Sequence, residues 1–267
     1  MADKALLVGI NRYPGCPLAG CINDVQDMAN LLVDQYKFRP EDVRLLCDER
    51  ATTAAILDRL NWLVDVKPGY RCFFHYSGHG AQFPSRDYKQ ELDGLLEVAC
   101  PVDFDWTPEK MITDKQFVQI FSRIPKDVKF NWVSDSCHSG DLTRNMPGSP
   151  FSPINHPRAY PVPVDIAWRV CDAHNRGMKK QERAMVCGVL DVGFISGCRS
   201  DQTSADTEIK GRPGGALTQT LIPVLRGCGI PTLLADIVKI TADDLSQAGY
   251  SQVPQCEGTR AKKPFLA

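Results

Sequence analysis

Two residues carry the side chains that a thiol-dependent hydrolase needs. Cys137 stands in NWVSDSCHSGDL, directly after an apolar run and among small residues. His79 stands in the short segment Ser77-Gly78-His79-Gly80, where glycines allow another backbone to approach closely. A cysteine reacts as the thiolate, and a nearby imidazole is the usual group that takes or balances its proton. The two residues are therefore candidates for a nucleophile and its base.

Backbone N–H groups near these residues could stabilise a developing negative charge. The small residues around Cys137 leave room for a substrate backbone. We expect the N–H groups of Cys137 and Gly78 to form such an oxyanion pocket.

Two other interpretations of these residues need weighing. The chain has eleven cysteines, an odd number, and none forms a C-x-x-C pair, so an inert packed thiol is the ordinary expectation for any one of them. His75, His79, Cys137 and His138 also offer zinc-binding atoms. In an extended segment, however, His75 and His79 would lie roughly 13 Å apart, at about 3.3 Å per residue, which disfavours a metal site.

Apolar runs alternate with helical patterns, which predicts a mostly parallel sheet covered by helices. The predicted strands are Lys4–Ile10, Val43–Asp48, Tyr70–Ser77, Val128–Ser134 and a short one near Gln252–Cys256, with regular structure also in Gly188–Cys198. The predicted helices cover Ile22–Tyr36, Ile56–Val64, Thr113–Ile124 and Gly215–Leu225, and a further helix opens at Pro231 and Thr232. Because reacting groups in such sheets gather beyond the carboxyl ends of the strands, both His79 and Cys137 fall where a site is expected.

The composition of the chain changes after Asp141. Six prolines stand between Met146 and Val164, which excludes a central strand there. We interpret 141–187 as an irregular insertion within a single domain spanning 1–267. A loop of that length is usually functional or mobile.

Charge and hydropathy exclude several function classes. The formal net charge is −1, with 31 basic and 32 acidic residues, so nucleic acid and anionic membranes are not expected partners. The first residues lack the long apolar region of a signal peptide, and no apolar run is long enough to span a bilayer. We expect a cytoplasmic monomer.

Four motifs in order give the chain a clear resemblance. The segments GCINDV, YSGHG, DSCHSG and SGCRSDQTSAD resemble those of metacaspases and the prokaryotic orthocaspases, which are caspase-like cysteine peptidases. The resemblance runs nearly end to end. It implies an α/β fold, a three-layer α/β/α sandwich with a mostly parallel central sheet, and hydrolysis of peptide bonds after Arg or Lys.

The resemblance also implies roles for particular residues. His79 becomes the base and acid, and Cys137 the nucleophile that forms an acyl-enzyme. Asp24 and Asp135 match acidic residues that line the pocket for the basic substrate side chain, where carboxylates replace the water of a guanidinium or ammonium group. Cys21 and Ser77 match neighbouring motif positions, and Asp201 is a further candidate for the pocket.

The chain departs from the family pattern at the calcium positions. Many metacaspases bind calcium through acidic residues, for which Asp93 and Asp114 are candidates here. Thr113 replaces a frequent second aspartate, and the residue seven after Cys137 is Arg144. Because a cation at that position repels calcium, we expect no cofactor and calcium-independent activity.

Alternative functions remain open from the sequence. A caspase-like scaffold with little activity is one, although such proteins usually lose a member of the dyad, and a peptidase that cuts after Asp or Asn is another. Within the insertion, Lys179, Lys180 and Arg183 are candidate self-cleavage sites, or simply a solvated basic loop.

Overall fold

A six-stranded sheet forms the centre of the protein. A computed structural model describes residues 3–85, 95–137, 156–175, 191–199 and 202–266, and the side chains of these residues other than 170–175. The strand order is β12-β9-β7-β3-β1-β2, and only β12 runs antiparallel to its neighbour. The strands are β1 (Asp3–Gly9), β2 (Val43–Cys47), β3 (Arg71–Ser77), β7 (Lys129–Asp135), β9 (Val192–Ser196) and β12 (Gln255–Glu257).

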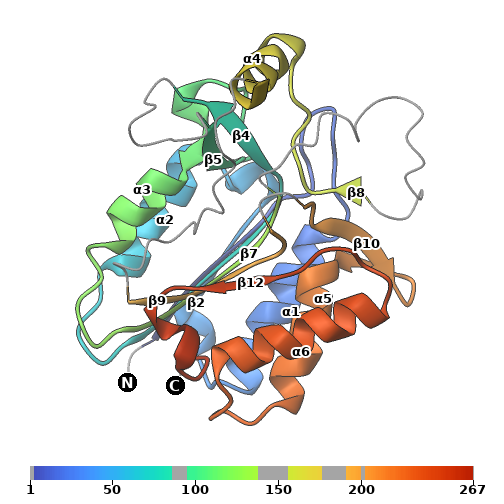
Figure 1. Cartoon of the computed structure of the whole chain (residues 1–267). Helices are drawn as coiled ribbons and strands as arrows, with labels where there is room; N and C mark the ends of the chain where they lie inside the picture. Colours follow the sequence, from blue (N-terminus) through green and yellow to red (C-terminus); the bar gives the residue numbers. More distant parts are fainter. Residues whose placement is uncertain (1–2, 86–94, 138–155, 176–190, 200–201, 267) are drawn as a thin grey trace.

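Helices cover both faces of this sheet. On one face lie α2 (Thr53–Val64) and α3 (Asp114–Phe121), and on the other lie α1 (Cys21–Asp34), α5 (Ala216–Gly227) and α6 (Leu234–Gln247), as Figure 1 shows. Alternation along the strands supplies both layers, because successive side chains point to opposite faces. In β3, for example, Phe74 packs in the core under α2 and α3, whereas Phe73 packs in the core under α1, α5 and α6. The α/β/α sandwich is confirmed.

Two small sheets and one helix extend beyond this sandwich. The first small sheet has the order β4-β5-β6, and the second has the order β11-β10-β8. Their strands are β4 (Gly80–Pro84), β5 (Leu95–Ala99), β6 (Ile112–Thr113), β8 (His156–Pro157), β10 (Ala205–Ile209) and β11 (Arg212–Gly215). The helix α4 (Val164–Asn175) stands at the top of Figure 1, apart from the sandwich.

The predicted elements match the observed ones closely where apolar runs are long. Thr52 caps α2 by accepting a hydrogen bond from Ala55 N at 3.3 Å, and Thr113 with Gln116 forms a capping box on α3. The insertion is less irregular than predicted, because 156–175 includes both β8 and α4. Two residues of strand are compatible with the proline content, since β8 is short and lies at a sheet edge.

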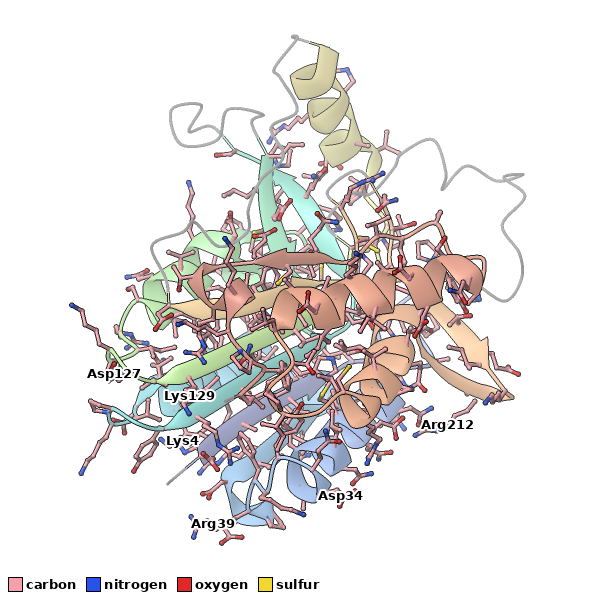
Figure 2. The ribbon with its side chains drawn as sticks, turned by 60° about the horizontal axis from the view of Figure 1, so that its bottom comes forward. Lys4, Asp34, Arg39, Asp127, Lys129 and Arg212 are labelled. Carbon is pink, nitrogen blue, oxygen red and sulfur yellow. The ribbon has the colours of Figure 1, made fainter. Side chains whose placement is uncertain are left out.

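Register brings the ends of three strands to one level. Gly9 of β1 pairs with Ser77 of β3, and Ser77 pairs with Asp135 of β7. The segments that follow these strands therefore leave the sheet side by side. At the opposite end, Figure 2 shows Lys4, Lys129 and Asp127 near the starts of β1 and β7. No described helix is long and apolar enough to cross a membrane.

Candidate active site

His79 lies in the turn between β3 and β4 and is buried, with 3% of its surface exposed. Its Nε2 lies 2.8 Å from the carbonyl oxygen of Cys16. Because a carbonyl only accepts, Nε2 carries the proton, and Nδ1 presents its lone pair without a hydrogen-bond partner among the described residues. Burial lowers the pKa of His79 to about 4, against the opposing effect of the Cys16 and Arg158 carbonyls. The imidazole is thus neutral at pH 7.

Tyr13 fixes the position of His79. Its hydroxyl accepts a hydrogen bond from the backbone N–H of His79 at 3.0 Å, and the two ring centroids lie 4.6 Å apart. The same hydroxyl donates to the carbonyl of Cys100 at 2.9 Å. A buried tyrosine with a satisfied hydroxyl holds the imidazole in one orientation.

Cys137 follows the end of β7 and is fully buried. Its sulfur lies between the backbone groups of Ser204, accepting from the N–H at 2.5 Å and donating to the carbonyl at 3.2 Å. Since Ser77 and Asp135 are paired across β3 and β7, His79 and Cys137 each follow the paired position by two residues. The sheet thereby brings the two predicted catalytic residues to the same place.

Two backbone N–H groups converge beside the cysteine, but they are not the predicted pair. The N–H of Gly78 donates to the carbonyl of Asp135 at 3.4 Å, extending the ladder between β3 and β7, so it is not free for a substrate. The N–H groups of Cys137 and Gly80 instead point to one oxygen, the carbonyl of Arg158, at 3.2 and 3.0 Å. Gly80 therefore replaces Gly78 in the predicted pocket.

Three carboxylates gather next to these groups, and we call Asp24, Asp135 and Asp206 the acid cluster. Each is buried, with at most 2% of its surface exposed. Asp24 and Asp135 come from predicted positions, on α1 and at the end of β7. Asp206 lies on β10. The predicted alternative, Asp201, falls outside the described residues.

Donors hold each carboxylate of the acid cluster in place. Asp135 accepts from the hydroxyls of Ser204 at 2.6 Å and Thr218 at 2.7 Å and from the N–H of Thr218 at 3.0 Å. Asp24 accepts from the hydroxyl of Ser77 at 2.9 Å and the N–H of Gly215 at 3.0 Å. Asp206 accepts from the N–H groups of Ala19 at 2.7 Å and Gly20 at 3.1 Å. Donors of this kind stabilise the charged form of each acid.

The guanidinium of Arg158 sits among these carboxylates with no exposed surface. Its Nη2 lies 2.7 Å from Asp24 and 2.8 Å from Asp206, and its Nη1 lies 3.2 Å from Asp135. Although burial opposes the charge, the carboxylates, Asp135 first, raise the pKa of Arg158. For Asp24 the balance goes the other way: burial raises its pKa despite Arg158. The cluster holds a guanidinium as a charged group.

Cys21 and Ser77 line the same place. Ser77 Oγ accepts from Arg158 Nη1 at 2.8 Å, which links the guanidinium to the end of β3. Burial raises the pKa of the Cys21 thiol, so this cysteine stays protonated. Gly215 is the residue over which the guanidinium passes, because a Cβ there would lie 2.5 Å from Arg158 Nη1.

Sequence reasoning missed Asp206 and Arg158. Asp206 is the second aspartate of SGCRSDQTSAD, and the motif alone does not fix which of the two faces the site. Arg158 stands between prolines in NHPRAYP and is the one Arg or Lys of that stretch. Arg158 could have been noticed as a single cation in a proline-rich segment, whose backbone is expected to be extended.

The described residues do not fit a calcium site. No group of three or more acidic, histidine or cysteine side chains among them is placed to hold a metal ion. Asp114 lies in the first turn of α3, where its Oδ1 accepts from the N–H of Lys115 at 2.8 Å. Asp93, His138 and Arg144 lie outside the described residues.

Comparisons with known proteins identify the family of this chain. The family described as metacaspase, peptidase C14 domain, matches residues 3–145. The chain belongs to the metacaspase family of cysteine peptidases. Metacaspase-1 of Schizosaccharomyces pombe is 31% identical over 94% of this chain and 66% of its own length, and Metacaspase-1B of Neurospora crassa is 33% identical over 94% and 65%.

This metacaspase chain thus spans about two thirds of the length of these curated relatives. A solved structure shares its fold: protein GSU0716 from Geobacter sulfurreducens matches with a TM-score of 0.70 and 24% identity, covering 98% of this chain and 97% of the other. At 24% identity this likeness shows a shared caspase-like fold and nothing further.

Proposed function

We propose that this metacaspase is a cysteine endopeptidase that cuts peptide bonds after Arg or Lys. The observation that carries the proposal is the acid cluster beside Cys137, three buried carboxylates held by fixed donors around one guanidinium. Buried carboxylates of this number require a cation, and a basic substrate side chain supplies one.

The proposed mechanism uses His79 and Cys137 as a dyad. Nδ1 of His79 takes the thiol proton as the sulfur adds to the substrate carbonyl carbon, while Nε2–H stays bonded to Cys16. The N–H groups of Cys137 and Gly80 stabilise the oxyanion. The proton then passes to the leaving amine, and water hydrolyses the resulting thioester.

A panel of fluorogenic peptides tests this function. Peptides ending in Arg or Lys should be cleaved, and matched peptides ending in Asp or Asn should not. Cys137→Ala should be inactive, because it removes the nucleophile. If neither Arg nor Lys peptides are cleaved under any calcium concentration, the proposal fails; cleavage of no peptide then favours a scaffold, and cleavage after Asp or Asn favours a peptidase of other specificity.

We further propose that the activity does not need calcium. The basic Arg144 at a family calcium position supports this. The rate should be equal in a chelator and in millimolar calcium, and an absolute requirement for calcium would overturn the proposal.

We propose protein or peptide substrates, a monomer, and a cytoplasmic location. Free thiols at all nine cysteines whose side chains the structure describes support a reducing compartment. Light scattering of the full chain tests the monomer.

A further inference from the structure

Residues 156–160 cross the candidate active site as an extended peptide. In β8, His156 pairs with Asp206 and Pro157 pairs with Ala205, antiparallel to β10. The N–H of Arg158 continues this pairing by donating to the carbonyl of Ser204 at 3.0 Å. Addition of an extended segment to a strand edge is a general way in which proteins bind peptides.

The backbone remains bound on both sides of the Arg158–Ala159 bond. The carbonyl of Arg158 accepts from Cys137 N and Gly80 N, and the N–H of Tyr160 donates to the carbonyl of Gly80 at 2.9 Å. Ala159 packs against Cys137 in a small buried cluster. A peptide whose carbonyl is bound by these two donors beside a thiol is placed for acyl transfer.

The segment's own side chains contact the protein on both sides of that bond. The guanidinium of Arg158 fills the acid cluster. Beyond the bond, the ring of Tyr160 lies 5.0 Å from that of Phe104 and 5.5 Å from that of His79. A purely structural ion pair would need the Arg158 side chain alone, whereas here the backbone is docked as well.

We propose that residues 156–160 are a tethered substrate, that Arg158–Ala159 is the first bond this protein cuts, and that Arg158 excludes other substrates until then. The proposal rests on the proposed function, because the cut requires peptidase activity. It places the first self-cleavage at Arg158 and not at Lys179, Lys180 or Arg183.

The cut is an ordinary acyl transfer followed by hydrolysis. Cys137 Sγ bonds to the carbonyl carbon of Arg158, and its proton passes through His79 to the nitrogen of Ala159 as the C–N bond breaks. Water then attacks the thioester and gives its proton to His79, which returns it to the sulfur. The products are a carboxylate at Arg158 and an amine at Ala159.

The structure shows the thiol before attack. The sulfur of Cys137 is engaged with both backbone groups of Ser204, and these bonds must break before it reaches the Arg158 carbonyl. Because Ser204 also accepts the N–H of Arg158, release of the sulfur does not require release of the tether.

The first test follows the intact full-length chain over time. Wild type should yield a new N-terminus at Ala159, found by mass and terminal sequencing, whereas Cys137→Ala should stay whole. Because the substrate is tethered, the fraction cut per hour should not depend on protein concentration. A concentration-dependent cut, or a first cut at another residue, would overturn the proposal.

The second test removes the cation of the tether. Arg158→Gln should lose the cut at this bond and cleave fluorogenic Arg peptides from the start, with an initial rate at least about tenfold above that of uncut wild type. Arg169→Gln, an exposed arginine of α4, is the matched control and should behave as wild type.

A free peptide gives a third measurement, which does not depend on how wild type processes itself. The sequence of residues 153–163, PINHPRAYPVP, should be cut by Arg158→Gln enzyme between Arg and Ala, and the same peptide with Gln for Arg should not. If no variant cleaves any basic peptide, the proposed function has failed. If wild type and Arg158→Gln cleave the fluorogenic peptides at equal initial rates and no Ala159 terminus forms, only the tether proposal has failed; the wild-type time course decides this even if Arg158→Gln does not fold.

Discussion

Two arginines, the partly buried Arg71 and the fully buried Arg158, lie at opposite ends of β3 and contact carboxylates in different ways. At the start of the strand, Arg71 makes a bidentate pair with Asp3, with Nε–Oδ1 at 2.9 Å and Nη2–Oδ2 at 2.6 Å. Beyond its end, Arg158 faces three carboxylates, each already held by backbone or hydroxyl donors. The first group is balanced in charge; the second is not.

The difference separates an ion pair that stabilises the fold from a site that binds a cation. Arg71 and Asp3 depend on each other, because loss of Arg71 leaves the buried charge of Asp3 unpaired. The acid cluster keeps its shape through donors of the scaffold, and the guanidinium enters on a segment outside the central sheet. Four predictions test this contrast, and a fifth tests the surface.

The largest effect is expected at the acid cluster. In a chain that already carries Arg158→Gln, Asp135→Asn should lower kcat/KM for Arg peptides by about 100- to 1000-fold, or about 3 to 4 kcal/mol, because a buried cation loses one partner. Asp3→Asn is the control, and it should change stability without changing kcat/KM. Equal kinetic losses in the two variants would remove the distinction between the two ends.

Stability should distinguish the arginines next. Arg71→Gln should lower the free energy of unfolding by about 3 kcal/mol, since it leaves Asp3 unpaired. In a Cys137→Ala background, Arg158→Gln should also lower it, but millimolar agmatine, a free guanidinium, should restore much of the loss by binding the acid cluster. Urea unfolding with and without agmatine measures both. If agmatine also restores the stability of Arg71→Gln, or restores that of neither variant, the acid cluster is not a site that binds a free guanidinium in place of Arg158.

A single methyl group should narrow the acid cluster. Gly215→Ala places a Cβ in collision with Asp135 Oδ2 and 2.5 Å from the position of the guanidinium. We expect kcat/KM for Arg peptides to fall by about 10- to 100-fold. Gly227→Ala, at the end of α5 with open space around its Cβ position, should leave kcat/KM unchanged.

Two buried histidines, His75 within β3 and His79 just beyond its end, should make the stability of the protein depend on pH. Burial lowers the pKa of His75 to about 4, as it does for His79. In the unfolded chain a histidine has a pKa of about 6.5, so below that pH the unfolded chain binds protons that the buried histidines of the folded chain do not bind. These residues therefore lower the free energy of unfolding as the pH falls from about 6.5 toward 4. Both proteins compared carry Cys137→Ala, and one of them also carries His75→Gln. In urea unfolding at pH 7, 6 and 5, the free energy of unfolding should fall less steeply with falling pH in the protein that carries His75→Gln. An identical dependence of the free energy of unfolding on pH in both proteins would contradict the lowered pKa of His75.

The smallest effect is expected at the surface. Arg39, labelled in Figure 2, contacts Asp42 at 2.7 Å but is 63% exposed. Solvent screens such pairs, so Arg39→Ala should leave the urea midpoint unchanged within error. A clear fall in the urea midpoint would mean that the exposed Arg39–Asp42 pair stabilises the protein as the Arg71–Asp3 pair does.

Much of the fold was predictable because its strands are long and apolar. The predicted strands from Lys4, Val43, Tyr70 and Val128 all exist, with ends shifted by a residue or so. The strands β4, β5, β10 and β11 were not predicted. They lie outside the main sheet and alternate less clearly, so local pattern gives little signal for them.

The site was predictable where a motif fixed it. His79, Cys137, Asp24 and Asp135 all come together as expected, since the first two and Asp135 lie at or just beyond strand ends and Asp24 lies in the first turn of α1. The N–H that converges with that of Cys137 belongs to Gly80 and not to the predicted Gly78, because the N–H of Gly78 extends the ladder after β3. Arg158 could not be found, because its place is set by contacts far along the chain.

The pairing of β8 with β10 has a consequence for the choice of substrates. If the tether withdraws after cleavage, one edge of β10 is left with open N–H and carbonyl groups. Only a chain that is already extended over several residues can match that edge, so helices and packed strands are rejected by shape before their sequence is read. Surface loops and unfolding segments of other proteins would then be cut first, which makes local order in the target a second criterion beside the basic residue.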